Sequence, residues 1–210
     1  MYNEQETHEK EALAHFKKVD PVLYTAGIKH KGTLASRIKE KKTNLALFQT
    51  LAESVVSQQL SVKAADTIWK RLEEACGGKV TPEAILTLQL PRLRACGLSA
   101  AKCKTLKELS TAVTNGLVLT KLKSMPEEEA IAKLTAIWGI GTWTAEMFLI
   151  FALGRRDVFS VGDLGLVRGI EMLYSIPQKS KKEVYENIAA TWSPYRSIAC
   201  LILWRTRDMP

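Results

Sequence analysis

The stretch that decides the fold is Leu134-Thr135-Ala136-Ile137-Trp138-Gly139-Ile140-Gly141-Thr142-Trp143-Thr144-Ala145. Apolar residues at helical spacing stand on both sides of a Gly-x-Gly turn, so the pattern predicts two helices joined by a tight hairpin. Glycine lets the backbone turn sharply and come close to another molecule, which opens backbone N–H groups to an anion such as phosphate. The alternative is an ordinary helix connection in which a glycine forms the C-cap of the first helix.

Helical spacing of apolar residues continues along nearly the whole chain, and no segment shows the sustained alternation of a β-strand. We therefore predict an all-α fold. Helix breakers stand where such helices would end, at Gly77-Gly78, Asn115-Gly116, Gly154 and Pro177. The predicted helices span residues 7–19, 45–57, 62–76, 82–87, 90–95, 100–115, 126–135, 142–153, 164–174, 181–190 and 195–205.

The chain of 210 residues is long enough for one sizeable core or two small lobes, and no Pro/Gly/Ser-rich linker divides it. We expect one cooperative unit, residues 1–210, folded as two helical lobes. Both ends of the chain would form one lobe, and residues of roughly 55–155 would form the other, with the hairpin at 134–147. A cleft between lobes is a natural place for a ligand.

The chain is strongly basic. Lysine and arginine number 30 against 22 acidic residues, which gives a formal charge of +8. Such a charge favours encounter with a polyanion and suits nucleic acid. A surface that only keeps the protein in solution would give the same count, so charge alone does not decide between the two.

The cysteines, the histidines and the N-terminus argue against several classes of protein. The four cysteines form no Cys-x-x-Cys pair and the three histidines all precede them, which is unlike a zinc site. Scattered cysteines in a chain of this size fit a reducing compartment. The start is polar, unlike a targeting peptide, and the longest apolar run, residues 147–153, is too short to cross a bilayer. We expect a soluble protein of the cell interior with no membrane partner.

The carboxylate of Asp163 stands between Gly162 and an apolar segment that is predicted to be helical. Its simplest role is an N-cap, in which the side chain accepts hydrogen bonds from first-turn N–H groups. An N-cap aspartate that also faced a cleft could act on a ligand, because the helix dipole would keep it ionised. The residues alone leave both roles open.

Five ordered motifs between Phe48 and Trp204 carry a resemblance to a known family. They are residues 51–65 (LAESVVSQQLSVKAA), Gly97-Leu98-Ser99 with Lys102, residues 137–147 (IWGIGTWTAEM), residues 157–163 (DVFSVGD) and residues 192–204. Together they resemble the helix-hairpin-helix DNA glycosylases, and among these the 3-methyladenine DNA glycosylase II type. Nothing resembles the added N-terminal sheet domain of longer relatives, so the compact form is implied. The implied fold has two lobes with the active-site cleft between them.

The resemblance implies a role for each residue of the site. Asp163 would be the catalytic carboxylate, and Gln59 or Leu60 would be the wedge that fills the gap left in the base stack. The base pocket would be lined by Trp143, Met147, Trp204 and Gln58. DNA would be bound by Gln59, Leu60, Gly139, Ile140, Gly141, Thr142 and Thr144, and the backbone carbonyls of Thr135, Ile137 and Ile140 would hold a structural monovalent cation. The alternative for the glutamines is a solvated turn, and for the tryptophans it is a place in the core.

The implied reaction is hydrolysis of the bond between deoxyribose and a damaged base that has been flipped out of double-stranded DNA. The substrates would be alkylated bases, 3-methyladenine and also 7-methylguanine. One carboxylate could suffice, because alkylation already makes the base a good leaving group. Bifunctional relatives carry a lysine where this chain has Trp143, so we expect no strand cleavage.

The chain departs from the family pattern at two positions. Trp138 stands where many hairpins carry proline, and Gly162 replaces a second acidic residue of some relatives. We expect that no cofactor is required. Cys96 and Cys103 have the spacing that begins an iron–sulfur motif, but leucine and alanine stand at the later positions, so we expect no cluster.

Two alternatives to this function stay open. The enzyme could act on another lesion, such as ethenoadenine or a deaminated or oxidised base, or the chain could be a non-catalytic helix-hairpin-helix DNA-binding protein. In each case the partner would be DNA, and we expect a monomer. The protein would work in the cytoplasm of a bacterium, with the nucleoid, or in the nucleus of a eukaryote.

Overall fold

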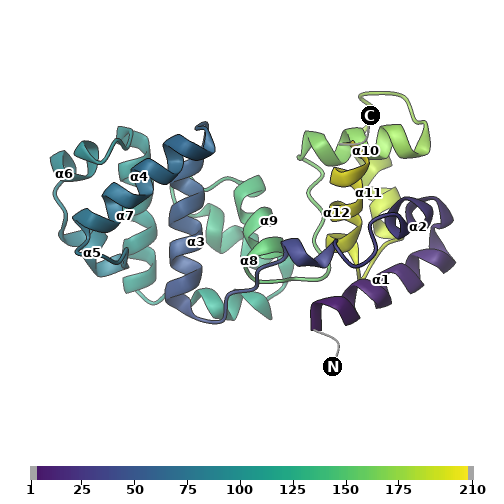
Figure 1. Cartoon of the computed structure of the whole chain (residues 1–210), viewed down its shortest axis with the longest axis horizontal. Helices are drawn as coiled ribbons and strands as arrows, with labels where there is room; N and C mark the ends of the chain where they lie inside the picture. Colours follow the sequence, from purple (N-terminus) through teal and green to yellow (C-terminus); the bar gives the residue numbers. More distant parts are fainter. Residues whose placement is uncertain (1–3, 208–210) are drawn as a thin grey trace. The chain divides into compact units, whose positions relative to one another are not determined.

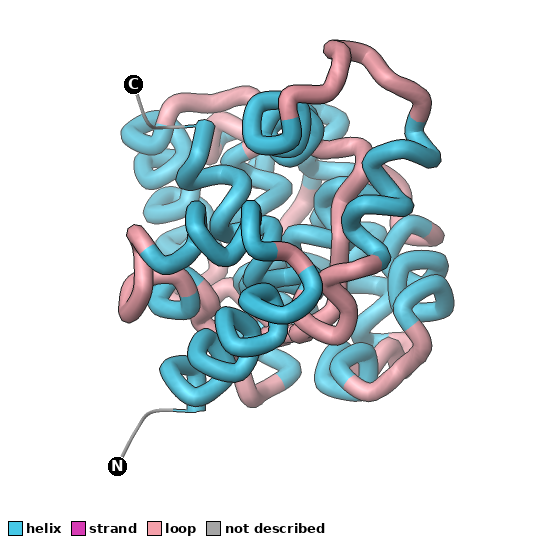
Figure 2. The backbone as a smooth tube through the Cα atoms, turned by 90° about the vertical axis from the view of Figure 1, so that its right-hand side faces the viewer, coloured by secondary structure: helices cyan, strands magenta, loops and turns pink. Residues whose placement is uncertain are grey.

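The computed structural model describes residues 4–207, in which loops join helices and no strand occurs (Figure 1 and Figure 2). The prediction of an all-α fold is confirmed. The chain divides into two compact units. Unit 1 consists of Met1–Lys39 and Gly154–Pro210, and unit 2 consists of Glu40–Leu153. The boundary expected near residue 55 lies inside helix α3 (Asn44–Ser57), which packs against other helices of unit 2 and therefore belongs to it as a whole.

Unit 2 is built around α3, whose buried residues recur at helical spacing. Leu47, Leu51 and Val55 follow one another by one turn and are fully buried, and the helix packs against α4, α7 and α9. Burying one such side chain contributes about 1.5–3 kcal/mol. The other elements of the unit are α4 (Val62–Ala75), α5 (Pro82–Thr87), α6 (Leu90–Ala95), α7 (Ala100–Thr114), the 3-10 helix η2 (Leu119–Lys123), α8 (Glu127–Thr135) and α9 (Thr142–Phe151).

Hydroxyl side chains fix the starts of four helices in unit 2. Thr43, Ser61, Thr81 and Ser99 accept hydrogen bonds from backbone N–H groups in the first turns of α3, α4, α5 and α7. Each such cap contributes about 1 kcal/mol. Because capping is a local property of the sequence, the predicted starts of these four helices agree with the structure to within one residue.

Unit 1 is organised by α12 (Arg196–Arg207), in which every residue from 198 to 203 is buried. A helix that is apolar on all sides belongs in the interior. Gly169 of α10 (Leu164–Tyr174) lies so close to it that an added Cβ would stand 2.9 Å from the Leu203 carbonyl oxygen. The other elements are α1 (Glu4–Val19), α2 (Pro21–Ile28), the 3-10 helix η1 (Ala35–Arg37) and α11 (Lys182–Ala190).

Helix α2 and the two 3-10 helices were not predicted from the sequence. Asp20 caps α2 by accepting from the Leu23 N–H at 2.9 Å, and Pro21 occupies the first helical position. This pair is a helix-start signal, but eight residues show too little periodicity to reveal the helix that follows. The same carboxylate accepts from the Tyr174 hydroxyl (2.5 Å) and the Trp192 indole (2.7 Å), so it joins α2 to the core of the unit.

The imidazole of His8 on α1 is buried, and its Nε2 atom has no hydrogen-bond partner within the described residues. Burial, with the nearby charge of Arg156, lowers the pKa of His8 from 6.5 to about 4. Between pH 6.5 and about pH 4 the His8 side chain is protonated in the unfolded chain but not in the folded chain. The free energy of unfolding therefore decreases as the pH falls through this range. We expect the wild type to lose up to about 2 kcal/mol more than His8→Gln between about pH 7.5 and pH 5, as measured by urea unfolding. Equal losses in the two proteins would contradict a buried neutral imidazole.

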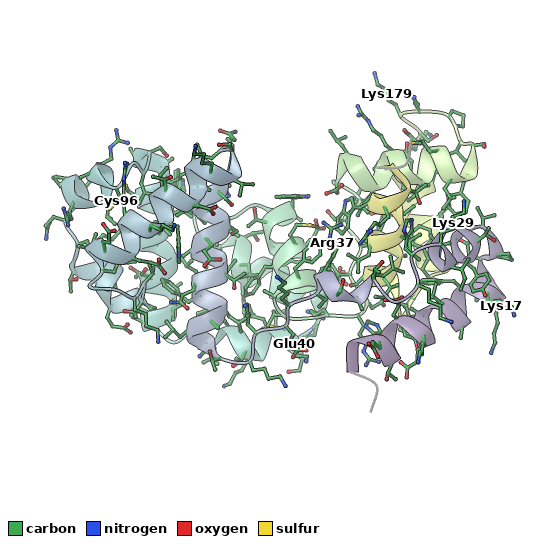
Figure 3. All side chains as sticks on the ribbon, in the orientation of Figure 1. Lys17, Lys29, Arg37, Glu40, Cys96 and Lys179 are labelled. Atoms are coloured by element: carbon green, nitrogen blue, oxygen red, sulfur yellow. The ribbon has the colours of Figure 1, made fainter. Side chains whose placement is uncertain are left out.

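Much of the basic charge stands on exposed side chains. Lys17, Lys29 and Lys179 of unit 1 extend outward from their elements (Figure 3). None of the helices between residues 4 and 207 combines the length and the apolar character needed to cross a bilayer.

Candidate functional site

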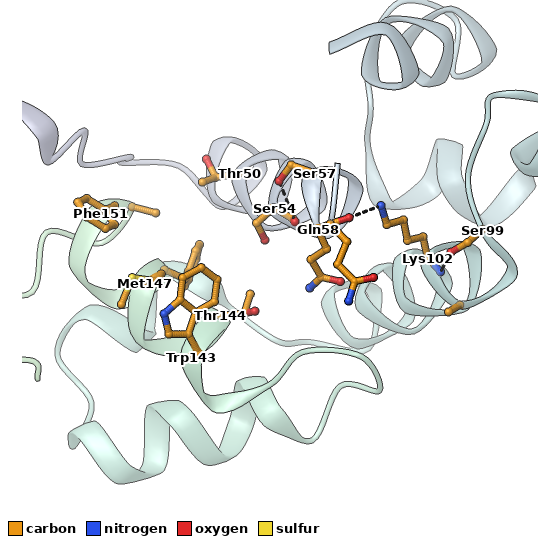
Figure 4. Close-up of a pocket in the computed structure, with 14 residues that line it drawn as sticks. Thr50, Ser54, Ser57, Gln58, Ser99, Lys102, Trp143, Thr144, Met147 and Phe151 are labelled. Atoms are coloured by element: carbon orange, nitrogen blue, oxygen red, sulfur yellow. Dashed lines mark hydrogen bonds between the residues drawn. The ribbon is translucent and has the colours of Figure 1, made fainter. Parts of the chain in front are cut away.

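A cavity of about 690 Å³ lies in unit 2 where α3, α7 and α9 meet (Figure 4). Its volume is within the range of small-molecule pockets, about 300–1,000 Å³. Among the described residues that line it, Lys102 is the only charged one. The lining consists of Thr50, Ser54, Ser57, Gln58, Gln59, Ser99, Ala101, Lys102, Trp143, Thr144, Met147, Phe148, Phe151 and Ala152.

One face of α9 forms the aromatic wall of this cavity. Trp143, Met147 and Phe151 follow one another at four-residue intervals, which places them on one face of the helix. Trp143 is 52% exposed, so it is not a core residue. Trp143 and Met147, both predicted to line the base pocket, share the cavity with a third predicted residue, Gln58 (Figure 4).

Hydroxyl groups of α3 lie in another part of the wall. Thr50 donates to the Ala46 carbonyl at 2.9 Å, and Ser54 donates to the Leu51 carbonyl at 2.7 Å. Because the proton is used in this way, each hydroxyl oxygen keeps a lone pair that can accept from a ligand. The cavity therefore combines aromatic surface with acceptors for an N–H group.

The two wedge candidates lie in the turn that follows α3. Gln59 is exposed, has a φ of 56° and lines the cavity. Leu60 is 39% exposed and is not part of the cavity wall. Neither side chain is packed into the core, so both stay candidates for the wedge.

The hairpin between α8 and α9 packs against α7. Gly139 has a φ of 86°, and an added Cβ would stand 2.0 Å from the Thr105 hydroxyl oxygen, so only glycine fits. Ile137 and Ile140 are buried, and the Ile140 N–H donates to the Ile137 carbonyl at 3.1 Å. The N–H of Ile140, a residue predicted to bind DNA, thus donates inside the turn, because the tight bend brings it close to that carbonyl.

The start of α9 lacks a capping side chain, since its N-cap is Gly141. First-turn N–H groups make no intrahelical hydrogen bond, and the helix dipole makes this end of a helix positive. Thr142 is exposed there, whereas Thr144 is buried. Apart from Gly141 and its chain neighbours, no atom of the described residues lies within 4 Å of a Cβ built on Gly141, so a phosphate could approach closely.

A cation and an aromatic ring stand beside the hairpin. Trp138 is 46% exposed, and Nζ of Lys104 lies 4.3 Å from its ring centroid. At exposed sites such a pair contributes about 0.5–1 kcal/mol. At position 138, where hairpins of the family that this chain resembles often have proline, the chain therefore has an indole with the Lys104 ammonium over its ring.

The backbone carbonyls of Thr135, Ile137 and Ile140 are predicted to hold a monovalent cation. Rings of neutral carbonyl oxygens can replace the hydration shell of such an ion. The Ile137 oxygen has a second lone pair beside the one that accepts from Ile140, and Thr135 ends α8, where carbonyls lack intrahelical partners. The chemistry of these carbonyl donors is therefore of the kind that a monovalent cation takes.

Asp163 and Trp204 both belong to unit 1, and they are hydrogen-bonded to each other. The Oδ1 atom of Asp163 accepts from the Leu166 backbone N–H at 2.9 Å and from the Trp204 indole N–H at 3.1 Å. The N-cap role of Asp163 is therefore confirmed. The half-buried carboxylate is oriented by two donors on one oxygen. Trp204, predicted to line the base pocket, is a hydrogen-bond donor to Asp163 and does not line the cavity of unit 2.

An ion pair holds the segment before Asp163 against the start of α12. Asp157 accepts from Nε of Arg196 at 2.7 Å and from the Ser193 hydroxyl at 2.8 Å. Burial alone would raise the pKa of Asp157, but the hydrogen bonds from Arg196 and Ser193 outweigh it and keep the pKa below its usual value. The helix that carries Trp204 therefore also anchors the approach to Asp163.

Three parts of these sites were not found from the sequence. They are the hydroxyls of α3, the Asp157–Arg196 pair and the two hydrogen bonds from Lys102 to carbonyls that lie 44 and 46 residues away. Lys102 was identified only as part of a turn motif. No local pattern reveals partners so distant in sequence.

Residues 52–194 match the family described as "HhH-GPD superfamily base excision DNA repair protein". The match covers more than half of the chain. The chain belongs to this superfamily.

Several relatives of this HhH-GPD protein are named for one activity. DNA-3-methyladenine glycosylase 1 of Schizosaccharomyces pombe is 38% identical over 83% of this chain and 77% of its own length. The structure of a DNA-3-methyladenine glycosidase from Bacillus halodurans matches with a TM-score of 0.82 and 36% identity, over 93% of this chain and 89% of that one. A 3-methyladenine DNA glycosylase of Schizosaccharomyces pombe, solved in complex with abasic DNA, matches with a TM-score of 0.69 and 31% identity, over 95% and 97%.

The HhH-GPD match includes most of the features described above. The hairpin, Trp143 and Asp163 lie inside the matched span, and Trp204 lies ten residues beyond it. In this HhH-GPD protein the hydrogen bond from Trp204 to Asp163 therefore joins a residue of the matched span to one outside it.

Proposed function

We propose that this HhH-GPD protein is a monofunctional DNA glycosylase that excises alkylated bases, with 3-methyladenine as the main substrate and 7-methylguanine as a second. The observation that carries the proposal is the Asp163 carboxylate, oriented by the Leu166 and Trp204 N–H groups at the start of α10. The names of its relatives support the substrate class.

The chemistry needs little more than one carboxylate. Alkylation at N3 or N7 puts positive charge on the purine, so the bond from C1′ of the sugar to the base breaks with its electron pair moving to the base. Asp163 would stabilise the positive charge that develops on the sugar. Water then adds to C1′ and gives up a proton, which Asp163 can accept, leaving an abasic site and a free base.

The cavity of unit 2 suits a cationic base. Stacking of such a base against an indole gives a cation–π attraction of about 0.5–2 kcal/mol, and Trp143 is exposed for this contact. The Thr50 and Ser54 oxygens could accept from an exocyclic amino group of the base. We infer that the flipped base enters here, between aromatic surface and these acceptors.

DNA would be held mainly through its phosphates. The net charge of +8, the uncapped start of α9 and the Lys104 charge beside the hairpin all favour a polyanion. A cation on the Thr135, Ile137 and Ile140 carbonyls would add to this contact. The reaction itself would need no cofactor. We also propose that the enzyme acts as a monomer wherever the cell keeps its DNA, in the bacterial cytoplasm or the nucleus.

The contacts of the cavity lysine support the proposal that the enzyme does not cleave the strand. A Schiff base needs an uncharged amine that can reach the sugar. The Lys102 amine instead donates to the backbone carbonyls of Val56 and Gln58 at 2.8 and 2.7 Å, so these two contacts engage it within unit 2. Trp143 occupies the position where bifunctional relatives carry their lysine.

The test is incubation of the protein with methylated duplex DNA, followed by identification of the released bases and of the strands. We expect free 3-methyladenine, a smaller amount of 7-methylguanine, and strands that stay intact until alkali breaks them at abasic sites. Release of only ethenoadenine or hypoxanthine from matched duplexes would overturn the substrate assignment. Strand breakage before alkali treatment would overturn the monofunctional assignment. Binding of DNA without release of any base would show that the protein is a non-catalytic DNA-binding protein.

A further inference from the structure

Residues 57–60, which begin at the last residue of α3, form a tight turn of a defined type. The Leu60 N–H donates to the Ser57 carbonyl at 3.1 Å. Gln58 has φ −49° and ψ 127°, and Gln59 has φ 56°. These values are those of a type II turn, in which the third residue has a positive φ and is usually glycine or asparagine. In this chain the third residue is Gln59.

A glutamine at positive φ is under backbone strain, because its Cβ crowds the following carbonyl. The strain would be relieved if the peptide plane between Gln58 and Gln59 rotated by about half a turn, since this converts a type II turn into a type I turn with negative φ at both central residues. Some other contact must therefore hold this peptide in its observed orientation.

Lys102 makes that contact. Its Nζ atom donates to the Gln58 carbonyl at 2.7 Å, and this carbonyl belongs to the peptide plane that would have to rotate (Figure 4). A second hydrogen bond, 2.8 Å long, goes to the Val56 carbonyl in the last turn of α3. A positive charge is favourable at this negative end of the helix dipole. Burial lowers the pKa of Lys102.

The backbone of Lys102 is itself fixed. Its N–H donates to the Ser99 hydroxyl, which caps α7, at 3.2 Å, and α7 packs against α3. The ammonium thus reaches the turn from a rigid support, and Gln58, Gln59 and Lys102 all line the same cavity.

We propose that Lys102 is a positioning residue that holds the Gln58–Gln59 peptide in the type II orientation and thereby aims both glutamine side chains for base flipping. This inference rests on the proposed glycosylase function. Without the lysine the turn would adopt the type I form for most of the time. If about a tenth of the molecules kept the competent form, the rate at low substrate would fall about tenfold.

Lys107 provides a matched control on the same helix. Its Nζ donates to the Leu86 carbonyl, in the last turn of α5, at 2.8 Å and to the Leu88 carbonyl, just beyond that helix, at 2.6 Å. Burial also lowers its pKa. None of these three residues lines the cavity. Lys107→Met therefore removes the same kind of contact, with a similar cost in stability, at a distance from the turn.

The experiment compares Lys102→Met, Lys107→Met and the wild type in excision of 3-methyladenine under single-turnover conditions. We expect a loss of about tenfold in Lys102→Met and less than about twofold in Lys107→Met. Fluorescence of a 2-aminopurine placed next to the lesion should show less unstacking with Lys102→Met alone. Equal losses in the two variants would overturn the proposal, because they would reflect general destabilisation.

A second substitution separates the turn from other roles of Lys102. Asparagine tolerates positive φ better than glutamine and keeps the amide group. Gln59→Asn should therefore restore several-fold of the rate lost in Lys102→Met, measured as the non-additive part of a double-mutant cycle. Additive effects would show that Lys102 does not act through the turn.

NMR of the free protein can determine the type of this turn independently of any activity measurement. A type II turn brings the Gln58 Hα close to the Gln59 amide proton, whereas a type I turn brings the two amide protons together. We expect the first pattern in the wild type and in Lys107→Met, and the second in Lys102→Met. An unchanged pattern in Lys102→Met overturns the proposal. The two proposals can also be separated. If Lys102→Met changes this pattern but the wild type releases no base, the glycosylase assignment is wrong and the effect of Lys102 on the turn still holds.

Discussion

Replacing Asp163 by asparagine is expected to lower base release from methylated DNA by at least about 10²-fold, because the variant removes the charge that stabilises the transition state. Asparagine caps helices as well as aspartate does. Its side-chain oxygen can still accept from Leu166 and Trp204, so the geometry at the start of α10 is kept. The free energy of unfolding should change by no more than about 1 kcal/mol. Single-turnover release and urea unfolding measure the two effects.

The control for Asp163→Asn is Glu186→Gln. Glu186 lies in the same unit, in an exposed ion pair with Lys182 at 3.1 Å, and its replacement changes the net charge by the same amount. Exposed pairs of this kind contribute about 0–1 kcal/mol, so this variant should excise bases at the wild-type rate. DNA affinity should be at least as high in both variants, since each removes one negative charge. Equal excision by Asp163→Asn and the wild type would remove Asp163 from the mechanism.

Replacing Gly139 by alanine is expected to cost about 2–5 kcal/mol of stability, combining about 1–2 for a left-handed backbone with about 1–3 for overpacking. The backbone φ of 86° disfavours any side chain, and the new methyl group would stand 2.0 Å from the Thr105 hydroxyl oxygen. The hairpin would have to move away from α7. We therefore expect duplex affinity to fall at least about tenfold as well, measured by fluorescence anisotropy alongside urea unfolding.

Gly141→Ala is the matched control in the same hairpin. Gly141 has an ordinary φ of −88°, and an added Cβ would meet nothing within 4 Å, so stability should stay within about 0.5 kcal/mol of the wild type. A loss of duplex affinity in this variant without loss of stability would support close approach of a phosphate to the start of α9. Combining Thr105→Ala with Gly139→Ala should recover most of the steric part of the cost and leave the backbone part. A Gly139→Ala protein as stable as the wild type would contradict the packing of the hairpin on α7.

Predictions from the sequence were most accurate where the determining interactions are local. The hydroxyl caps Thr43, Ser61, Thr81 and Ser99 mark helix starts that agree with the structure to within one residue. Prediction failed at α2, where a valid start signal precedes too few residues to show a period. The sequence also did not show that the Ile140 N–H donates to the Ile137 carbonyl, because a local pattern does not reveal which carbonyl the bend brings within reach.

The candidate site was only partly predictable. The motif containing Trp143 and Met147 indicated a pocket wall, and the four-residue spacing of a helix places both side chains in one cavity. Trp204 was assigned to the same pocket by resemblance. In the structure its indole donates to Asp163, a residue 41 positions away in the chain, which the sequence did not reveal.

The sequence by itself determined that the chain is helical, that it bends at a glycine hairpin and that Asp163 begins a helix. These properties depend on backbone conformation and on hydrogen bonds within one helical turn, so nearby residues suffice to set them. Only the tertiary structure decided that Lys102 reaches the turn of Gln58 and that Gly139 has no room for a side chain. Those properties arise because helices that are far apart in the sequence pack at van der Waals distance. No local pattern encodes which side chain will lie opposite which carbonyl.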